Sequence, residues 1–308
     1  MRIVFMGTPH FATAILRQLV SDGYEVVGVV SQPDKKVGRK QIVTATPVHA
    51  CADEFNIEVY QPISIKEGFD KIQEWNPDMI VTCAYGQMIP LSILEYPKYG
   101  SLNVHASLLP KYRGAAPIQW AVINGDEISG VTTMRMDIGV DTGDMIAKRE
   151  LRLAEDETGG SLFDKLSKLG ASLCVETMEM IENGTAQYTP QDHTAATHTS
   201  MIQKELGNIE WSRPAVEIER LIRGLNPWPS AFTRLDGKTF KIWKAKVVPS
   251  EGEYGVGCIC KIGKNEMVVQ TGKDCLSLEE VQLEGKKRMD VGSFLRGYEV
   301  EAGTFFQF

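Results

Sequence analysis

The sequence has no cysteine pattern that would hold a metal or build a disulfide framework. Its six cysteines are scattered along 308 residues, and none forms a C-x-x-C motif. Cys258 and Cys260 lie two residues apart, which places them on one face of a predicted strand. Zinc sites and disulfide-stapled domains both need closely spaced sets of cysteines. We therefore expect buried free thiols and no metal site.

Long apolar runs are also missing. No segment approaches the roughly 18–20 consecutive apolar residues that cross a bilayer. The start, MRIVFMGTP, has one basic residue and a very short apolar run, unlike a signal peptide. These absences predict a cytoplasmic protein without membrane contact.

An overall excess of positive charge, typical of proteins that bind nucleic acid indiscriminately, is absent as well. The formal net charge is −7. The charge is uneven, however, because the chain from Leu206 onward has 15 Lys and Arg against 14 Asp and Glu, whereas the part before it has 18 against 26. The two parts therefore differ in electrostatic character, and a local basic surface is compatible with the second.

The N-terminal stretch lacks the complete fingerprint of a dinucleotide-binding fold. Gly7 is followed by Thr-Pro-His-Phe-Ala, without the second glycine of G-x-G-x-x-G. The second predicted strand ends in VVSQPDKK, where Asp34 follows a proline instead of closing the strand. An NAD-linked oxidoreductase is therefore disfavoured. Gly7 is expected to allow a tight turn from strand to helix.

The first half does contain a regular alternation of short apolar runs and amphipathic segments. The Val- and Ile-rich runs RIVFMG, EVVGVVSQP, PDMIVTCAYG and YGSLNVHAS alternate with helical patterns such as HFATAILRQLVSDG. This β-α-β pattern predicts an α/β fold with a Rossmann-like, doubly wound, mainly parallel sheet. Ligands of such sheets bind at the carboxyl ends of the strands.

The second half changes character. A long amphipathic helix is followed by TPQDHTAATHTSMIQKEL, which is polar, rich in threonine and without sheet alternation. Many short predicted strands follow, with a hairpin signal at Asp236 and Gly237. We predict an α/β domain over residues 1–188, a linker over 189–206 and a small C-terminal OB-like β-barrel over 207–308.

Asn103 and His105 lie at the end of a predicted strand, on one face and roughly 7 Å apart. An amide beside an imidazole can donate hydrogen bonds to an oxygen that becomes negative, which suits acyl-type transfer through a tetrahedral intermediate. Ser107 lies nearby, but no G-x-S-x-G elbow surrounds it, which argues against a serine hydrolase. A solvated or core histidine is the alternative.

The turn DIGVDTGD, residues 137–144, brings three acids and two glycines together. Its spacing is not that of an EF-hand and no second ligand cluster is visible, so a metal-binding loop is disfavoured. One aspartate beside His105 would instead orient the imidazole and favour its protonated form. A solvated acidic turn is the alternative.

Five motifs in one order resemble the methionyl-tRNA formyltransferases within the wider 10-formyltetrahydrofolate-dependent transferases. These motifs are GTPHFA, QPDKKVGR, YGQMIP, NVHASLLPKYRGAAPI and MDIGVDTGDMI. The resemblance runs from Met1 to the last strands. It implies an enzyme that transfers the formyl group of 10-formyltetrahydrofolate to the α-amine of methionine on initiator Met-tRNA, for translation initiation.

By this resemblance, Asn103, His105 and Asp141 match the catalytic trio of the family. Protonated His105 and Asn103 would stabilise the oxyanion, and Asp141 would hold His105 and help to move the amine proton. No metal and no covalent intermediate are implied. The residues expected to line the tetrahydrofolate site are Ser107, Leu108, Leu109, Pro110, Tyr85, Gly86, Gln87, Met88 and Ile89.

The resemblance also implies two sets of tRNA contacts. The loop after the second strand matches the family's insertion toward the acceptor stem, with Arg39 as its functional arginine and Lys35, Lys36 and Lys40 beside it. In the C-terminal barrel, the residues expected to follow phosphates are Lys241, Lys244, Lys246, Lys286, Lys287 and Arg288. A solvated basic surface is the alternative for each set.

Two other functions stay open. One is another folate-dependent formyltransferase, acting on a glycinamide ribonucleotide or an amino sugar, which gives the last hundred residues no clear role. The other is a catalytically silent RNA-binding protein, which leaves SLLP unexplained. The expected partners are the initiator Met-tRNA and the folate co-substrate, and nothing in the sequence demands more than a monomer.

Overall fold

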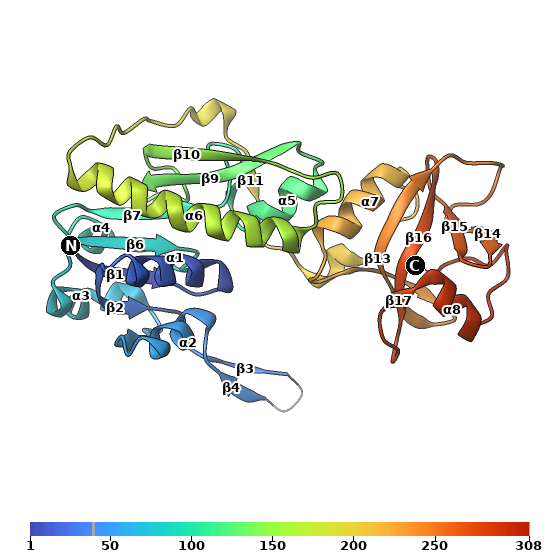
Figure 1. The fold of residues 1–308 in the computed structure, drawn as a ribbon, viewed down its shortest axis with the longest axis horizontal. Helices are drawn as coiled ribbons and strands as arrows, with labels where there is room; N and C mark the ends of the chain where they lie inside the picture. Colours follow the sequence, from blue (N-terminus) through green and yellow to red (C-terminus); the bar gives the residue numbers. More distant parts are fainter. Residues whose placement is uncertain (39–40, 308) are drawn as a thin grey trace. The chain divides into compact units, whose positions relative to one another are not determined.

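The computed structural model describes residues 1–38 and 41–307, and these residues form two compact units. The first comprises Met1–Pro117, Ile128–Arg152 and Phe163–Thr199, and the second comprises Ile118–Glu127, Leu153–Leu162 and the described chain from Ser200 on. Each unit is built around its own large sheet (Figure 1). No helix among the described residues combines the length and the apolar character needed to cross a bilayer.

The first unit contains a seven-stranded sheet in the order β10-β9-β7-β6-β1-β2-β5. Its strands are β1 (Arg2–Gly7), β2 (Glu25–Val30), β5 (Val59–Tyr60), β6 (Met79–Cys83), β7 (Ser101–His105), β9 (Ile128–Arg135) and β10 (Met145–Arg152). The pairs among β5, β2, β1, β6 and β7 are parallel, whereas β9 is antiparallel to β7 and β10. The predicted α/β fold with a Rossmann-like, mainly parallel sheet is confirmed.

Helices cover both faces of this sheet. They are α1 (His10–Ser21), α2 (Pro47–Glu54), α3 (Phe69–Trp75), α4 (Leu91–Leu94) and α6 (Gly159–Glu182). On one face, Met6 of β1 belongs to the same buried cluster as Trp75 of α3. On the other, α1 and α6 lie in front of the sheet in Figure 1, and Phe11 meets Phe163 edge to face with ring centroids 5.6 Å apart. The sheet is therefore a buried middle layer.

The strand order reverses beside β1. The chain adds β2 and β5 on one side of β1 and then places β6 on the other. The carboxyl ends of β1, β6 and β7, at Gly7, Cys83 and His105, therefore lie next to one another, where ligands of such sheets bind. A Cβ on Gly7 would lie 2.8 Å from Ala12 and 3.0 Å from the Cys83 carbonyl, so close packing requires glycine at this turn.

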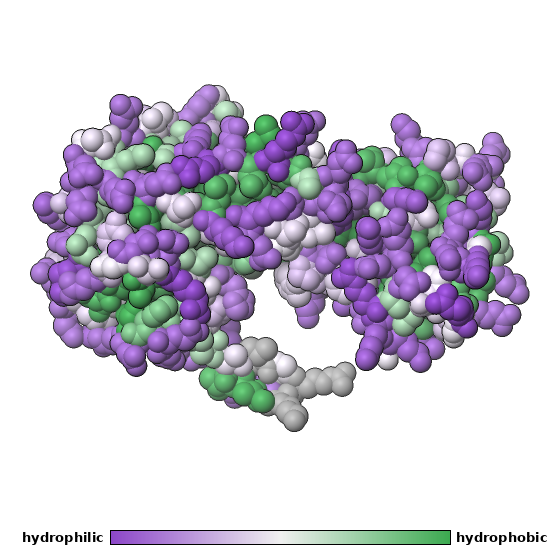
Figure 2. Space-filling model, in the orientation of Figure 1, coloured by the Kyte–Doolittle hydropathy of each residue, from purple (hydrophilic) through white to green (hydrophobic). Residues whose placement is uncertain are grey.

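Between β2 and α2 the chain forms an antiparallel hairpin of β3 (Lys35–Val37) and β4 (Ile42–Thr44), where the sequence indicated only a loop. The hairpin projects from the first unit in Figure 1. Ile42 and Val43 are 60% and 62% exposed, and the hairpin shows hydrophobic surface in Figure 2. Arg39 and Lys40, two of the predicted tRNA contacts, lie outside the described residues.

The second unit contains an antiparallel sheet in the order β12-β13-β16-β15-β14, with β17 beside β16. Its strands are β12 (Ala231–Leu235), β13 (Lys238–Val248), β14 (Ile259–Gly263), β15 (Glu266–Gln270), β16 (Cys275–Leu283) and β17 (Met289–Asp290), and its helices are α5 (Pro117–Ile123), α7 (Ala215–Gly224) and α8 (Val291–Gly297). Asp236 and Gly237 have φ of 50° and 73° at the β12–β13 turn. The predicted hairpin is confirmed.

The C-terminal segment joins the two edges of this sheet. Phe305 pairs with Cys258 just before β14, and Gln307 pairs with Arg234 of β12. The next residue in the segment, Phe306, stacks on the fully buried Trp211, with ring centroids 5.3 Å apart. Joined edges are compatible with the predicted OB-like barrel, whose closure stays a prediction.

The segment predicted to be a linker forms ordered contacts. Thr189 pairs with Met145 of β10. Further along, β11 (His198–Thr199) forms a two-stranded parallel sheet with β8 (Arg113–Gly114). Short 3-10 helices occur here at His193–Ala195 and Lys204–Gly207, and a third lies outside this segment at Ile65–Glu67. Residues up to Thr199 group with the first unit, and those from Ser200 with the second.

Candidate active site

The candidate site begins on β7, where strand alternation places Asn103 and His105 on one face at the carboxyl end. The neighbouring strands extend this polar row. Thr82 of β6 stands beside Asn103, and Thr132 of β9 stands opposite His105. Asn103 and His105 are 7% and 8% exposed, so their hydrogen-bonding groups need partners from the protein or from a ligand.

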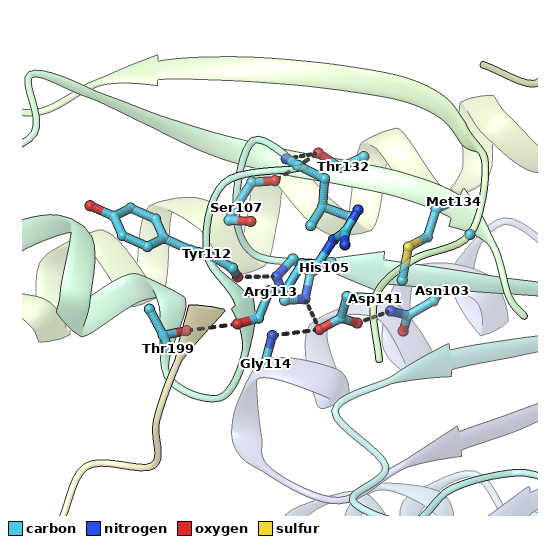
Figure 3. Close-up of polar contacts among 12 residues, drawn as sticks. Asn103, His105, Ser107, Tyr112, Arg113, Gly114, Thr132, Met134, Asp141 and Thr199 are labelled. Carbon is cyan, nitrogen blue, oxygen red and sulfur yellow. Dashed lines mark hydrogen bonds and ion pairs between the residues drawn. The ribbon is translucent and has the colours of Figure 1, made fainter. Parts of the chain in front are cut away.

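Asp141 reaches the site from the loop between β9 and β10. Its Oδ2 lies 3.6 Å from His105 Nδ1 and accepts a hydrogen bond of 2.8 Å from the Gly114 amide. Its Oδ1 lies 3.5 Å from Asn103 Nδ2. Figure 3 shows the carboxylate between these three groups. The structure thus brings together Asn103, His105 and Asp141, the three residues predicted to be catalytic.

Asp137, another acid of this turn, has other surroundings. Asp137 accepts hydrogen bonds from the Gly139 amide at 3.0 Å and the Thr142 hydroxyl at 2.7 Å, so it shapes the turn. A Cβ on Gly143 would lie 1.8 Å from the Arg135 carbonyl, so only glycine fits there. Throughout the described chain, no group of three or more His, Cys, Asp and Glu is placed to hold a metal ion.

A backbone carbonyl fixes the orientation of the His105 ring. Nε2 lies 2.9 Å from the Tyr112 carbonyl, which can only accept, so this nitrogen carries the proton in the neutral ring. Tyr112 itself has a left-handed φ of 62°, and its amide donates to the Thr197 hydroxyl at 2.8 Å. Nδ1 is therefore the nitrogen left for chemistry. It can accept a proton when the ring is neutral and donate one when the ring is charged.

Thr82 fixes the orientation of the Asn103 amide. The Thr82 hydroxyl donates to Asn103 Oδ1 at 2.9 Å, so the amide turns its NH₂ group toward Asp141. We did not anticipate Thr82 from the sequence. The sequence contains a signal for it, because Thr82 lies in VTC, near the end of the predicted strand that precedes the strand of Asn103.

The resulting arrangement suits an oxygen that gains negative charge. Asn103 Nδ2 and His105 Nδ1, which donates when the ring is charged, both face the Asp141 carboxylate. Their distances to its oxygens are longer than an ordinary hydrogen bond. Catalytic hydrogen bonds are often long before substrate binds and shorten in the reacting complex. Donors preorganised in this way stabilise a tetrahedral oxyanion, while the carboxylate can orient the imidazolium and take up a proton.

The SLLP stretch begins two residues after the end of β7. Ser107 is 1% exposed and its hydroxyl donates to the Lys111 carbonyl at 2.6 Å, which leaves it engaged in structure and agrees with the absence of a nucleophile elbow. Leu109 is fully buried, and the Leu109–Pro110 peptide bond is cis. Leu108 and Pro110 keep partly exposed surface, so these two side chains are the ones available to a ligand.

The YGQMI stretch follows β6, the neighbouring strand. Tyr85 and Ile89 are 4% and 5% exposed and belong to a buried cluster, and Gln87 accepts a hydrogen bond of 2.8 Å from the backbone of an adjacent loop. These three side chains therefore serve the fold. Met88 is 53% exposed, and Gly86 presents only backbone. Backbone groups and Met88 are what this stretch can offer to a pterin ring.

Titratable groups near these strand ends are perturbed by burial. Lys148 of β10 donates to the Leu109 carbonyl, and burial lowers the pKa of its ammonium. Burial also raises the pKa of the Cys83 thiol well above its ordinary value. Both shifts favour the neutral form. Of the two groups, only Cys83 lies where water is largely excluded, because Lys148 is an exposed residue.

The predicted tRNA contacts that the structure describes belong to other elements than those that carry the catalytic trio. Lys35 and Lys36 are exposed on β3 of the projecting hairpin. On β13, Lys241 lies 5.5 Å from the centre of the Trp243 ring, and Arg288 lies 5.0 Å from the same ring. The structure therefore places an aromatic side chain beside two of the predicted basic contacts.

The other basic residues of the second unit differ in their ion pairs. Lys244 and Lys246 lie 3.1 and 3.9 Å from Glu279 of β16. Arg288, besides its contact with Trp243, pairs with Glu280. Lys286 and Lys287 are exposed, and within the described part of the chain neither has a carboxylate at ion-pair distance.

Comparison with known families agrees with this geometry. Residues 1–178 match the family described as formyl transferase, and residues 201–299 match the formyl transferase C-terminal domain. The chain is 65% identical over 308 residues to the methionyl-tRNA formyltransferase of Agathobacter rectalis, covering 99% of both chains. It is 48% identical over 305 residues to that of Clostridioides difficile, covering 98% of this chain and 99% of the relative.

Solved structures share the fold at low identity. An N-formyltransferase from Helicobacter canadensis, in complex with folinic acid and dTDP-3-aminofucose, matches with a TM-score of 0.66 and 18% identity over 90% of this chain and 98% of that one. HypX from Aquifex aeolicus, in complex with tetrahydrofolic acid, matches with a TM-score of 0.63 and 17% identity over 100% of this chain and 51% of that one. With two domain matches and close relatives along its whole length, the chain belongs to the methionyl-tRNA formyltransferase family.

Proposed function

We propose that this protein transfers the formyl group of 10-formyltetrahydrofolate to the α-amine of methionine on initiator Met-tRNA. The observation that carries the proposal is the approach of the Asn103 amide and the His105 imidazole to the Asp141 carboxylate at the end of β7. Relatives named methionyl-tRNA formyltransferase match nearly the whole chain, which favours this acceptor over a small amine. The folate compounds bound in two structural neighbours support the donor.

The mechanism follows from the donors and the carboxylate. The methionine amine attacks the formyl carbon, and the former carbonyl oxygen becomes negative in the tetrahedral intermediate. Protonated His105 donates to this oxygen from Nδ1, and Asn103 donates from Nδ2. Asp141 holds the imidazolium and accepts the amine proton, directly or through a water. The intermediate then collapses, the bond from the formyl carbon to the folate nitrogen breaks, and the proton that Asp141 accepted passes to this leaving nitrogen.

The two stretches that follow β6 and β7 hold the folate in this proposal. SLLP, residues 107–110, and YGQMI, residues 85–89, extend from adjacent strand ends beside the trio. The pterin pairs with backbone groups of the YGQMI stretch, because its side chains at Tyr85, Gln87 and Ile89 are engaged in the fold. Leu108, Pro110 and Met88 supply apolar contact.

We assign the tRNA to two basic surfaces. The β3–β4 hairpin, with Lys35 and Lys36, contacts the acceptor end, and the open face of β13 and β16 contacts phosphates elsewhere on the tRNA. In this proposal, residues 1–188 form the catalytic domain, 189–206 the linker and 207–308 the tRNA-binding domain. A lysine beside a partly exposed Trp243 ring suits a surface that meets both phosphates and bases.

The proposal is tested by following labelled formyl from 10-formyltetrahydrofolate to methionine-charged initiator tRNA, with charged elongator tRNA and a small amino sugar as competing acceptors. We expect transfer to the initiator alone. His105→Ala should lower kcat by about 10²–10³-fold, because it removes one oxyanion donor. His10→Ala is the matched control, since His10 is exposed at the start of α1.

Two outcomes would overturn the proposal. Formylation of the amino sugar without formylation of the tRNA would keep the folate chemistry and move the acceptor to a small amine. Equal losses in the two histidine variants would remove His105 from the reaction.

A further inference from the structure

A buried glutamine connects the segment after α6 to the loop that carries Asp141. Gln191 is only 5% exposed. Its Nε2 donates to the carbonyl oxygens of Asp141 and Gly143, both at 2.8 Å. Both acceptors belong to the same short loop, so one side-chain amide holds the backbone on each side of residue 142.

The other end of the same amide is fixed by a buried guanidinium. Gln191 Oε1 accepts from Arg113 Nε at 3.0 Å and from an Arg113 terminal nitrogen at 2.7 Å. Arg113 is 3% exposed, and a terminal nitrogen of its guanidinium also lies 3.1 Å from His193 Nδ1. Because the guanidinium has only donors, it forces Oε1 toward itself and turns the Gln191 NH₂ group toward the Asp141 loop.

The Asp141 loop needs hydrogen bonds of this kind to hold its backbone in place. Asp141 has a left-handed φ of 54°, which a residue with a Cβ adopts at some cost. Its neighbours Ile138 and Val140 are 68% and 51% exposed, so the loop gains little from burial. The carboxylate must nevertheless stay 3.6 Å from His105 Nδ1. The backbone bonds from Gln191 are therefore placed to fix this approach.

We propose that Gln191 is a positioning residue for catalysis, which holds the Asp141 carboxylate against His105 through the backbone carbonyls of Asp141 and Gly143. Arg113 is the anchor that orients the Gln191 amide. This inference rests on the proposed function, since it assigns to Gln191 the support of a group that the mechanism uses. It also gives the start of the predicted linker a role in the chemistry.

The test is Gln191→Glu in the tRNA formylation assay. Glutamate has the same shape and still accepts from Arg113, but it replaces the NH₂ donor by an oxygen that repels the two loop carbonyls. We expect kcat to fall about 10–100-fold, as small misplacements of catalytic groups do. The KM values for folate and for Met-tRNA should stay within about twofold.

Ala195→Glu is the matched control. It adds the same charge four residues along, at an exposed position, and should leave kcat and both KM values unchanged. If Gln191→Glu does not fold, Gln191→Met replaces it. Methionine keeps the length of the side chain and removes both of its hydrogen-bonding roles, so the same fall in kcat is expected.

A double-mutant cycle with Asp141→Asn separates positioning from general support of the fold. If Gln191 acts through Asp141, Gln191→Glu should cost nothing further in the Asp141→Asn background. Independent losses that multiply, or a kcat unchanged in Gln191→Glu, would overturn the inference. Failure of the proposed function looks different, because the natural protein would then formylate the amino sugar and not the tRNA.

Discussion

A single backbone carbonyl determines what the histidine of the site can do. The Tyr112 carbonyl accepts a hydrogen bond from His105 Nε2–H, so Nδ1 is the nitrogen that faces Asp141 and the space where a reacting oxygen would lie. A histidine held by a carbonyl and a carboxylate has both its tautomer and its ring plane set. The same ring can thus donate to the oxyanion when charged and receive a proton when neutral.

Tyr85 carries the residue-scale prediction on stability. Its side chain is 4% exposed, its hydroxyl has no hydrogen-bond partner in the described structure, and burial raises the pKa of the phenol. A buried hydroxyl without a partner costs about 1–3 kcal/mol. Tyr85→Phe should therefore unfold at an equal or higher urea concentration, with a gain of up to about 2 kcal/mol, and should formylate tRNA at the normal rate.

The contradicting result for Tyr85 is equally specific. A Tyr85→Phe variant that loses more than about 1 kcal/mol would show that the hydroxyl has a partner in solution. A variant of normal stability with a raised KM for the folate would show that the hydroxyl contacts the co-substrate. Titration with the folate alone distinguishes the second case from an effect on tRNA.

The sequence could identify some site residues and not others, for a physical reason. Asn103 and His105 were recognisable because strand periodicity puts them on one face at a strand end. Asp141 came from the family resemblance. Gln191 and Thr82 were missed, because their roles depend on partners 50 and 21 residues away in sequence. Periodicity carries no information about such pairings, and a polar, threonine-rich stretch around Gln191 is also typical of a linker.

At the scale of elements, one carboxylate anchors the β3–β4 hairpin to the first unit. Asp34 precedes β3, and it accepts hydrogen bonds from the Thr46 amide at 3.2 Å, His49 Nδ1 at 3.0 Å and Gln61 Nε2 at 2.7 Å. Thr46 in turn caps α2 and bonds to Ser31 at 2.6 Å. The two ends of the hairpin, helix α2 and the end of β5 are thus tied together at Asp34.

This anchor predicts an acid-dependent loss of stability. Burial alone would raise the pKa of Asp34, but the hydrogen bonds from His49, Gln61 and Thr46 outweigh it and lower the pKa. A carboxyl group whose pKa is lowered by folding stabilises the folded state at pH values above its pKa in the unfolded chain, which is about 3.9. This contribution is lost as the pH falls through the pKa of the folded state.

Asp34→Asn should therefore be less stable than the natural protein by about 1.5–3 kcal/mol between pH 5 and pH 7, since hydrogen bonds to charged groups are of that order. The difference should narrow below about pH 4. Urea unfolding at a series of pH values measures it, and hydrogen exchange of the hairpin amides locates it. Stability curves that run parallel down to pH 3 would remove Asp34 from this role.

Elements were predictable where one local pattern sufficed. The parallel strands were visible in the sequence as Val- and Ile-rich runs. The β12–β13 turn was visible as the pair Asp236-Gly237, because this turn requires positive φ at both residues. The β3–β4 hairpin was not predictable, because each strand is only three residues long and β3, with its exposed lysines, pairs with the exposed Ile42, Val43 and Thr44 of β4 instead of forming an apolar run. The short β8–β11 pair was hidden as well, since it joins segments about 85 residues apart in sequence.

At the scale of the whole molecule, the uneven charge is the property that bears on function. The chain is acidic overall, yet from Leu206 onward basic and acidic residues nearly balance. Part of the basic charge there is already neutralised, because Glu279 pairs with Lys244 and Lys246, and Glu280 pairs with Arg288. Such a surface attracts RNA less strongly than its number of lysines suggests, because binding must first break these pairs.

The lysines should consequently divide into two classes in their response to salt. Lys286 and Lys287 have no ion pair in the described structure, whereas Lys244 lies 3.1 Å from Glu279, which raises the pKa of its ammonium. Each phosphate contact that releases a counterion contributes about one unit to the slope of log affinity against log salt. Lys286→Gln with Lys287→Gln should lower the slope for initiator tRNA by about two units, and Lys244→Gln should lower it by less than one unit.

Fluorescence titration of the tRNA at four salt concentrations measures these slopes. Equal slopes in all variants would place the RNA elsewhere on the protein. A larger change of slope for Lys244→Gln would mean that the tRNA replaces Glu279 as the partner of Lys244. The glutamate would then hold the lysine in position for the RNA instead of weakening its contact with phosphate.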